Sequence, residues 1–171
     1  MKNLLCILFA VLHLSAFSQK PAFEKPVTVY IFLAETCPIC QNYTLTLKNL
    51  YKEYASKNVR FVGVFPNYYS DQKSIDAFRK AYSIPFDLVL DKNQLLVKHF
   101  KADTTPEAFV ESSDKKILYS GRIDDSFYAL GKRRTVISCN ELADALEQIT
   151  SGQTVTKSKT QAVGCIITTS K

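Results

Sequence analysis

Two cysteines three positions apart, Cys37 and Cys40, follow an apolar, β-branched run and precede a helix-like segment. The run spans residues 27–34 (VTVYIFLA), and apolar residues recur at about helical spacing within 41–57. This order predicts a buried strand followed by a helix, with the cysteine pair at the junction. Unpaired N–H groups and the partial positive charge of a helix N-terminus lower the pKa of a thiol there. The pattern therefore indicates a dithiol/disulfide redox centre.

Strands and helices alternate along the rest of the chain, which has 171 residues, enough for one ordinary domain. A helix from Asp71 to Ala81 is predicted because Asp71 is a good N-cap residue. Alternating elements favour an α/β domain with a mixed sheet. The further predicted strands are 59–65, 86–90, 107–111 and 116–121, the further helices are 91–101 and 140–150, and 121–134 is a predicted loop.

The first 18 residues are typical of an export signal. Lys2 supplies a positive charge, residues 4–14 are mostly apolar, and Ala16-Phe17-Ser18 is a small-x-small cleavage site. We expect a signal peptide over 1–18, a domain over 19–152 and a cysteine-containing tail over 153–171. No later stretch is long and apolar enough to span a membrane, so we expect no membrane span in the mature chain. From the export signal we expect a protein of the bacterial periplasm or cell envelope.

Cleavage after residue 18 would remove Cys6 and leave four cysteines, in a compartment where disulfides persist. Two of them, Cys139 and Cys165, lie outside the close pair. Cys165 is thirteen positions beyond Gly152, and an extended chain of that length reaches about 40 Å. Three roles for Cys165 stay open: a third redox thiol at Cys37, a bridge to Cys139, or a bridge to another chain. The tail before residue 163 is rich in Thr, Ser and Lys and is predicted to be mobile.

Other chemistries fit the sequence less well. A structural zinc site usually needs a second close ligand pair, and only Cys139, Cys165 and His99 are available. Haem attachment needs a histidine after the second cysteine, where Gln41 stands. We expect no metal and no cofactor, a surface role for His99, and a solvated strand-end position for Glu35. The formal charge of +6 comes without basic runs that alternate with aromatic residues, so no nucleic-acid partner is expected.

At three places the chain resembles the thioredoxin-like superfamily, in its exported redoxin (AhpC/TSA-type) branch. Residues 34–40 (AETCPIC) are similar to its strand-to-helix active-site segment, Thr105-Pro106 stands where the superfamily keeps a cis-proline, and 118–125 (LYSGRIDD) is similar to the last strand and following loop. The resemblance covers about 27–152. It implies a three-layer α/β fold with a mixed central sheet in the order 2-1-3-4, helices on both faces, and a short strand–helix insertion.

The resemblance also implies roles for single residues. Both sulfurs would face solvent at the head of the helix. Cys37, as the more exposed one, would attack a disulfide in a partner protein, and Cys40 would resolve the mixed disulfide. Pro106 would shape the substrate groove, which Thr36, Pro38 and Thr105 would line. The implied activity is thiol–disulfide exchange with protein disulfides or dithiols. The dipeptide between the cysteines is Pro-Ile instead of Gly-Pro, so reductant, oxidant and isomerase all remain open.

Two relatives of this fold offer other functions. In a peroxiredoxin-like thiol peroxidase, Cys40 would be the thiol that reacts with peroxide, Arg122 would activate it, and Cys37 or Cys165 would resolve the product. In a Sco-type copper carrier, the two thiolates and His99 would hold Cu(I).

Overall fold

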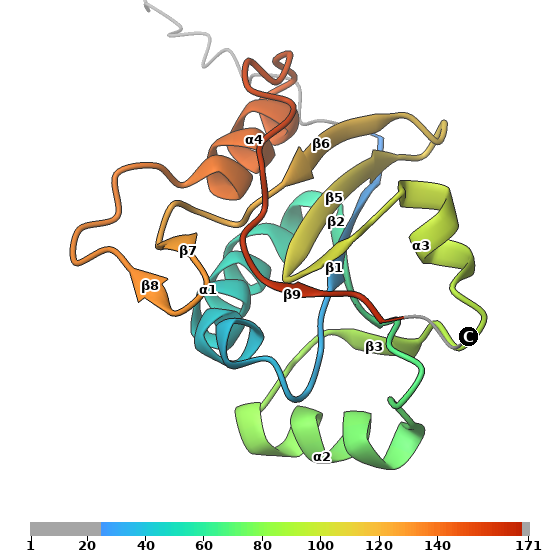
Figure 1. Ribbon diagram of the computed structural model, residues 1–171. Coiled ribbons are helices and arrows are strands. Elements are labelled where there is room, and N and C mark those ends of the chain that lie inside the picture. Colours follow the sequence, from blue (N-terminus) through green and yellow to red (C-terminus); the bar gives the residue numbers. More distant parts are fainter. Residues whose placement is uncertain (1–24, 169–171) are drawn as a thin grey trace, which may run out of the picture.

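The centre of the protein is a five-stranded sheet in the order β3-β2-β1-β5-β6 (Figure 1). This computed structural model describes residues 25–168, so the predicted signal peptide and Cys6 lie outside the described residues. The strands of the sheet are β1 (Val27–Phe32), β2 (Val59–Phe65), β3 (Asp87–Leu90), β5 (Glu107–Ser112) and β6 (Ile117–Gly121).

The sheet is mixed, as the resemblance implied. Strand β1 pairs in parallel with β2 and antiparallel with β5, while β2–β3 is parallel and β5–β6 antiparallel. The expected order 2-1-3-4 corresponds to β2-β1-β5-β6, and it is confirmed. The inserted strand β3 extends the sheet beyond β2.

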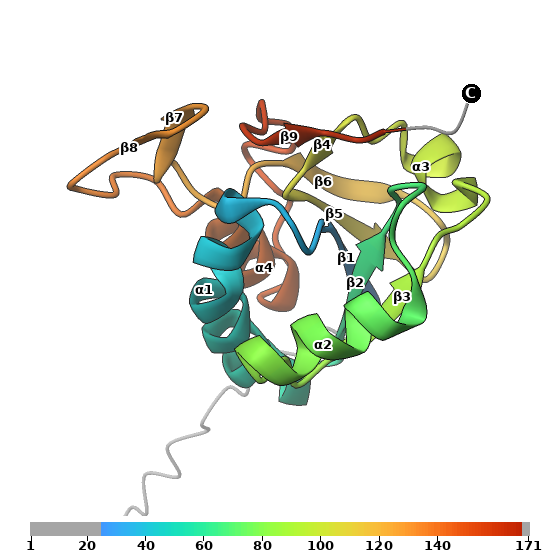
Figure 2. The same ribbon diagram turned by 60° about the horizontal axis from the view of Figure 1, so that its bottom comes forward.

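Helices cover both faces of the sheet (Figure 2). Three pack on one face, where Val29 and Ile31 of β1 point: α1 (Pro38–Tyr54), α2 (Gln72–Tyr82) and α4 (Glu141–Thr150). The short α3 (Leu95–Phe100) covers the other face, where Phe32 packs against Phe100. Successive strand residues point to opposite faces, so a strand buried on both sides is apolar throughout. This explains the unbroken apolar run of β1.

At the start of two helices, a carboxylate accepts hydrogen bonds from backbone N–H groups of the first turn. The Asp71 carboxylate accepts a hydrogen bond from the backbone N–H of Ser74 at 2.7 Å, which confirms the predicted N-cap of α2. The Asp91 carboxylate accepts hydrogen bonds from the backbone N–H groups of Leu95 at 2.8 Å and Val97 at 3.0 Å. These bonds explain why α3 begins at residue 95 and not at 91 as predicted.

The segment 121–134 is more regular than the predicted loop. It contains two short antiparallel strands, β7 (Phe127–Ala129) and β8 (Lys132–Arg133), which form a hairpin that projects from the body of the domain (Figure 2). The following helix α4 begins close to the predicted position. Among residues 25–168, no helix is both long and apolar enough to cross a membrane.

The prediction of a mobile tail is wrong for the described residues. The tail first runs beside β6, where Ser120 N donates to Ser158 O at 2.9 Å and Thr160 N donates to Ser120 O at 2.9 Å. It then forms β9 (Cys165–Ile166), which pairs antiparallel with β4 (Thr104–Thr105). This segment has no periodic pattern in the sequence, because its pairings with β6 and β4 are short and join it to strands that are distant along the chain.

Candidate redox site

Cys37 is the N-cap residue of α1. Its backbone is extended (φ −83°, ψ 115°) and Pro38 occupies the first turn, where a missing N–H costs nothing. Cys37 N donates to Ala34 O at 3.2 Å, and Gln41 N donates to Cys37 O at 3.1 Å. The turn between β1 and α1 therefore fixes the Cys37 sulfur at the positive end of a 17-residue helix.

The Cys37 thiol meets a residue 68 positions away: it donates a hydrogen bond to Thr105 O at 3.4 Å. The sheet explains this contact, because β1 and β5 are antiparallel neighbours with Phe32 opposite Glu107. The end of β1 thus lies beside the start of β5, and the segment that leads into β5 passes the cysteine pair. The Thr105–Pro106 peptide bond in this segment is cis, as the resemblance implied.

The second cysteine is fully enclosed. Cys40 is 0% exposed, and its sulfur accepts a hydrogen bond from Ala34 N at 3.4 Å. Burial, followed by the hydrogen bond and charge of Cys37, raises the pKa of Cys40 well above its ordinary value. A hydrogen bond from Cys40 outweighs burial at Cys37 and lowers the pKa of that thiol to about 5. The pair therefore holds its negative charge on Cys37 and its proton on Cys40.

The expectation that Cys37 faces solvent is wrong in this structure: its exposed fraction is 2%. The tail lies across the site, with Cys165 opposite Thr105 in the β4–β9 ladder. The Cys165 side chain is near enough to Cys37 for each thiol to shift the pKa of the other. Burial and then the hydrogen bond and charge of Cys37 raise the pKa of Cys165 to about 12. Of the roles left open for Cys165, this geometry favours the one at Cys37.

Cys139 lies elsewhere, before α4. Its backbone N–H donates to the Asp125 carboxylate at 3.1 Å, and its side chain is partly exposed. All four described cysteines are free thiols. Cys139 is therefore no part of the dithiol site, and it offers a matched control for experiments on the other three.

The expected groove residues lie around the cysteine pair. Thr36 and Pro38 are exposed at its rim, and the Thr36 hydroxyl lies 3.2 Å from the Tyr69 hydroxyl. Thr105 is 0% exposed, and its hydroxyl donates to Cys165 O at 3.2 Å. In this structure the tail lies beside Thr105, in the place where the resemblance implied a substrate groove.

Glu35 is more firmly held than a solvated strand-end residue. Its carboxylate accepts hydrogen bonds from the Ser70 hydroxyl at 2.9 Å and the Ser74 hydroxyl at 2.7 Å. These bonds join the turn before Cys37 to the start of α2. No pattern in the sequence predicted them, because they link segments 35 and 39 positions apart.

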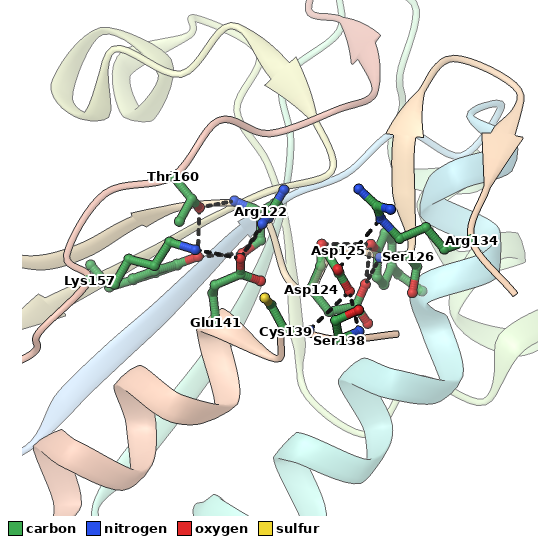
Figure 3. Close-up of polar contacts among 12 residues, drawn as sticks. Arg122, Asp124, Asp125, Ser126, Arg134, Ser138, Cys139, Glu141, Lys157 and Thr160 are labelled. Carbon is green, nitrogen blue, oxygen red and sulfur yellow. Dashed lines mark hydrogen bonds and ion pairs between the residues drawn. The ribbon is translucent and has the colours of Figure 1, made fainter. Parts of the chain in front are cut away.

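Two residues named for other chemistries are engaged away from the thiols. His99 Nε2 lies 2.7 Å from the Glu111 carboxylate. Arg122 and Lys157 both bind the buried carboxylate of Glu141 (Figure 3). Within residues 25–168, no cluster of three or more His, Cys, Asp or Glu side chains is arranged to hold a metal ion. The ligand set of the copper hypothesis and the activating arginine of the peroxidase hypothesis are therefore not assembled here.

A sequence model described as "AhpC/TSA family" matches residues 10–120, more than half of the chain. The chain belongs to the AhpC/TSA family. Similar solved structures support the same fold for this AhpC/TSA member. An uncharacterized conserved protein of Geobacillus kaustophilus has a TM-score of 0.76 at 24% identity, covering 85% of this chain and 78% of that chain. A hypothetical protein of Sinorhizobium meliloti has a TM-score of 0.73 at 23% identity, covering 85% and 80%.

Two further similarities carry functional names. A secreted disulfide oxidoreductase of Mycobacterium tuberculosis has a TM-score of 0.53 at 16% identity, covering 71% of this chain and 81% of that chain. The chloroplastic peroxiredoxin Q of Populus jackii is 29% identical over 76 residues, which are 44% of this chain. The match spans only 34% of the length of that relative. The comparisons thus establish the thioredoxin-like redoxin fold, and they do not identify a substrate.

Proposed function

We propose that this protein is an exported thiol–disulfide oxidoreductase that exchanges its Cys37/Cys40 pair with disulfides in partner proteins. The observation that carries the proposal is the placement of Cys37 as the N-cap residue of α1, in contact with Thr105, with the enclosed Cys40 one turn further along the helix. Cys37 is a low-pKa thiol at a helix N-terminus, and Cys40 is an adjacent buried thiol that retains its proton. A cysteine that attacks a disulfide needs a low pKa, and a resolving cysteine needs to stay protonated until the mixed disulfide has formed.

The chemistry follows ordinary disulfide exchange. The Cys37 thiolate attacks one sulfur of a partner disulfide, and the other partner sulfur leaves as a thiolate. Cys40 then loses its proton and attacks the Cys37 sulfur, which forms the Cys37–Cys40 disulfide and releases the partner as a dithiol. Two electrons pass from this protein to the partner. The reverse sequence would oxidise a partner, so the same residues serve either direction.

The strand pairing of the segment before Pro106 supports an extended polypeptide as the substrate. The backbone of Thr104 and Thr105 pairs with a strand in this structure, and strand addition is a common way to bind extended peptides. Thr36 and Pro38 at the exposed rim would contact residues near the partner cysteine. Pro106 in its cis form presents the Thr105 carbonyl to the Cys37 thiol.

The test is reduction of insulin disulfides by dithiothreitol in the presence of the purified mature chain. We expect Cys37→Ser to abolish the acceleration and Cys139→Ser to leave it unchanged. Unchanged activity in Cys37→Ser would overturn the assignment. The reduction potential of the couple then sets the direction: roughly −270 mV, as in thioredoxin, would mean a reductant, and about −120 mV an oxidant.

Export is a separate part of the proposal and depends on residues 1–18, which lie outside the described residues. It is tested by expressing the full chain in a Gram-negative host, fractionating the cells, and sequencing the N-terminus. We expect a periplasmic product that starts at Gln19. A cytoplasmic product with Met1 intact would contradict it.

The similarity to peroxiredoxin Q favours a second candidate, a thiol peroxidase in which Cys40 reacts with peroxide. The enclosure of Cys40 and its raised pKa argue against it. Stopped-flow oxidation by hydrogen peroxide separates the two candidates. We expect slow oxidation that Cys40→Ser does not slow further, whereas a fast reaction lost in Cys40→Ser would favour the peroxidase.

A further inference from the structure

The tail occupies the position that we assign to a substrate peptide. Strand β9 pairs antiparallel with β4, with Thr104 opposite Ile166 and Thr105 opposite Cys165. Ile167 N continues the pairing by donating to Asp103 O at 2.9 Å. The residue opposite Thr105, beside the reactive thiol, is itself a cysteine. The tail therefore presents a thiol where a bound partner would present its disulfide.

The residue before this cysteine allows the close approach. A Cβ atom built on Gly164 would lie 2.1 Å from Thr105 O and 2.6 Å from Thr105 C. Both atoms belong to the backbone and cannot move aside as a flexible side chain can. Only glycine at position 164 lets the tail lie against the segment that faces Cys37.

The tail is anchored on both sides of Cys165. On the N-terminal side, the Lys157 ammonium binds Glu141 at 3.0 Å, and the Thr160 hydroxyl accepts a hydrogen bond from Arg122 N at 3.0 Å (Figure 3). On the C-terminal side, the Asn67 side-chain oxygen accepts hydrogen bonds from Thr168 N at 2.8 Å and from the Thr168 hydroxyl at 3.0 Å. Two anchors hold the thiol between them at a high effective concentration.

From this placement we propose that the tail is a tethered substrate segment and that Cys165 is a third redox thiol, which forms a disulfide with Cys37. The proposal builds on the exchange activity of Cys37 and Cys40 proposed above. In the oxidised protein, the Cys165 thiolate attacks the Cys37 sulfur of the Cys37–Cys40 disulfide. The Cys37–Cys165 bond forms, the Cys37–Cys40 bond breaks, and Cys40 leaves as a thiolate that takes up a proton. The oxidation state of the protein does not change.

This exchange would close the groove covalently. A partner disulfide reaches Cys37 only when the tail has moved away, since Cys37 is 2% exposed beneath it. With Cys165 bonded to Cys37, the groove stays occupied until Cys40 or an external thiol reverses the exchange. The tail would therefore compete with partner proteins for the same sulfur.

The experiment uses the full mature chain with Cys40→Ser, equilibrated in glutathione redox buffers, acid-quenched and alkylated. Trypsin leaves Cys37 in a peptide that ends at Lys48, Cys139 in 135–157, and Cys165 in 160–171, so mass spectrometry identifies each linkage. In Cys40→Ser we expect Cys37–Cys165 to be the main disulfide. In a second variant, Cys37→Ser with Cys40 intact, we expect no Cys40–Cys165 disulfide.

The matched variants are Gly164→Val and Ile166→Val, each in the Cys40→Ser background. The two positions flank Cys165, and each variant carries a valine there, but the Ile166 side chain is 78% exposed. We expect Gly164→Val to lower the ratio of Cys37–Cys165 to Cys37–glutathione at least tenfold, and Ile166→Val to leave the ratio unchanged. Far-UV circular dichroism confirms that each variant is folded.

Failure of this proposal is distinguishable from failure of the proposed function. If Cys40→Ser accumulates only Cys37–glutathione, or if Gly164→Val leaves the ratio unchanged, the tethered-substrate role is overturned. The insulin assay with Cys165→Ser reports separately on Cys37 and Cys40. We expect equal or faster insulin reduction in that variant, because the competing thiol is gone, and a complete loss would contradict the role of Cys165 as a competitor.

Discussion

The Cys37 thiol donates a hydrogen bond to the backbone carbonyl of Thr105 over 3.4 Å. A carbonyl can accept from a thiol but offers nothing to a thiolate, so this bond is lost when Cys37 ionises. The thiolate must then be stabilised by other groups, and the hydrogen bond from Cys40 is the largest contribution. The site therefore changes its hydrogen bonds with the ionisation of Cys37.

The first prediction concerns this ionisation. Thiolate absorbance near 240 nm in the reduced protein should rise with a midpoint close to pH 5, the lowered pKa of Cys37. Cys40→Ala removes the main hydrogen bond and should move the midpoint upward by a unit or more, while Cys139→Ser should not move it. A midpoint near the ordinary value of 9 in the unmodified protein would contradict the assignment of Cys37 as the thiolate.

The same shift has a consequence for stability. The pKa of Cys37 is lower in the folded state than in the unfolded state, so ionisation of Cys37 stabilises the folded reduced protein. This stabilisation is complete above the unfolded-state pKa of about 9. It decreases as the pH falls and is lost once the pH passes through about 5. In urea unfolding under reducing conditions, the difference between the protein and Cys37→Ser should shrink from about pH 8 to about pH 5. A constant difference over this range would mean that Cys37 ionises alike in both states.

The second prediction tests Glu35 as a structural link. Glu35→Ala removes both hydrogen bonds to Ser70 and Ser74, and hydrogen bonds to charged groups contribute about 1.5–3 kcal/mol. We expect a loss of about 1–3 kcal/mol in the free energy of unfolding, measured with urea, and an unchanged titration midpoint for Cys37. The control is the exposed Glu53→Ala, with an expected change within about 0.5 kcal/mol. A shifted midpoint would give Glu35 a role in proton transfer instead.

The third prediction concerns Glu141, whose side chain is 3% exposed and binds Arg122 and Lys157. Burial raises the pKa of Glu141, but the hydrogen bonds from these two cations outweigh it, and the net pKa lies below the ordinary value of 4.5. Its contribution to stability is therefore present above pH 4.5 and lost as the pH falls further.

The variant Glu141→Ala should reduce the free energy of unfolding by about 2–3 kcal/mol at neutral pH, because it leaves Arg122 without its carboxylate. The exposed Glu147→Ala on the same helix is the control and should change it by less than about 0.5 kcal/mol. Hydrogen exchange of residues 157–160 should accelerate in Glu141→Ala alone. Equal exchange in both variants would mean that Glu141 does not anchor the tail.

The fourth prediction concerns the other anchor. Asn67 is 1% exposed, and its side chain holds Thr168. In Asn67→Ala the tail should open more often, and alkylation of reduced Cys37 by iodoacetamide should accelerate roughly 5–10-fold. The exposed Asn93→Ala should leave the rate unchanged. If Asn67→Ala also leaves it unchanged, the tail does not control access to Cys37.

Local patterns were sufficient for the site's own segment. The apolar run of β1, the cysteine spacing and the helical periodicity of α1 lie within 28 consecutive residues, from Val27 to Tyr54. Periodicity, capping and N-terminal helix electrostatics act over such short distances, so the sequence alone determined the strand, the helix and the position of Cys37 at the junction. Resemblance added the sheet order and the cis-proline segment.

Tertiary structure decided what surrounds the thiols. The contacts of Glu35 with Ser74, of Cys37 with Thr105, and of Cys165 with the β4 strand join segments 39 to 68 positions apart. None has a periodic signal, because each depends on one or two backbone or side-chain atoms brought together by the sheet. For that reason the sequence predicted an open dithiol and a mobile tail, whereas the folded chain places its own cysteine over the site.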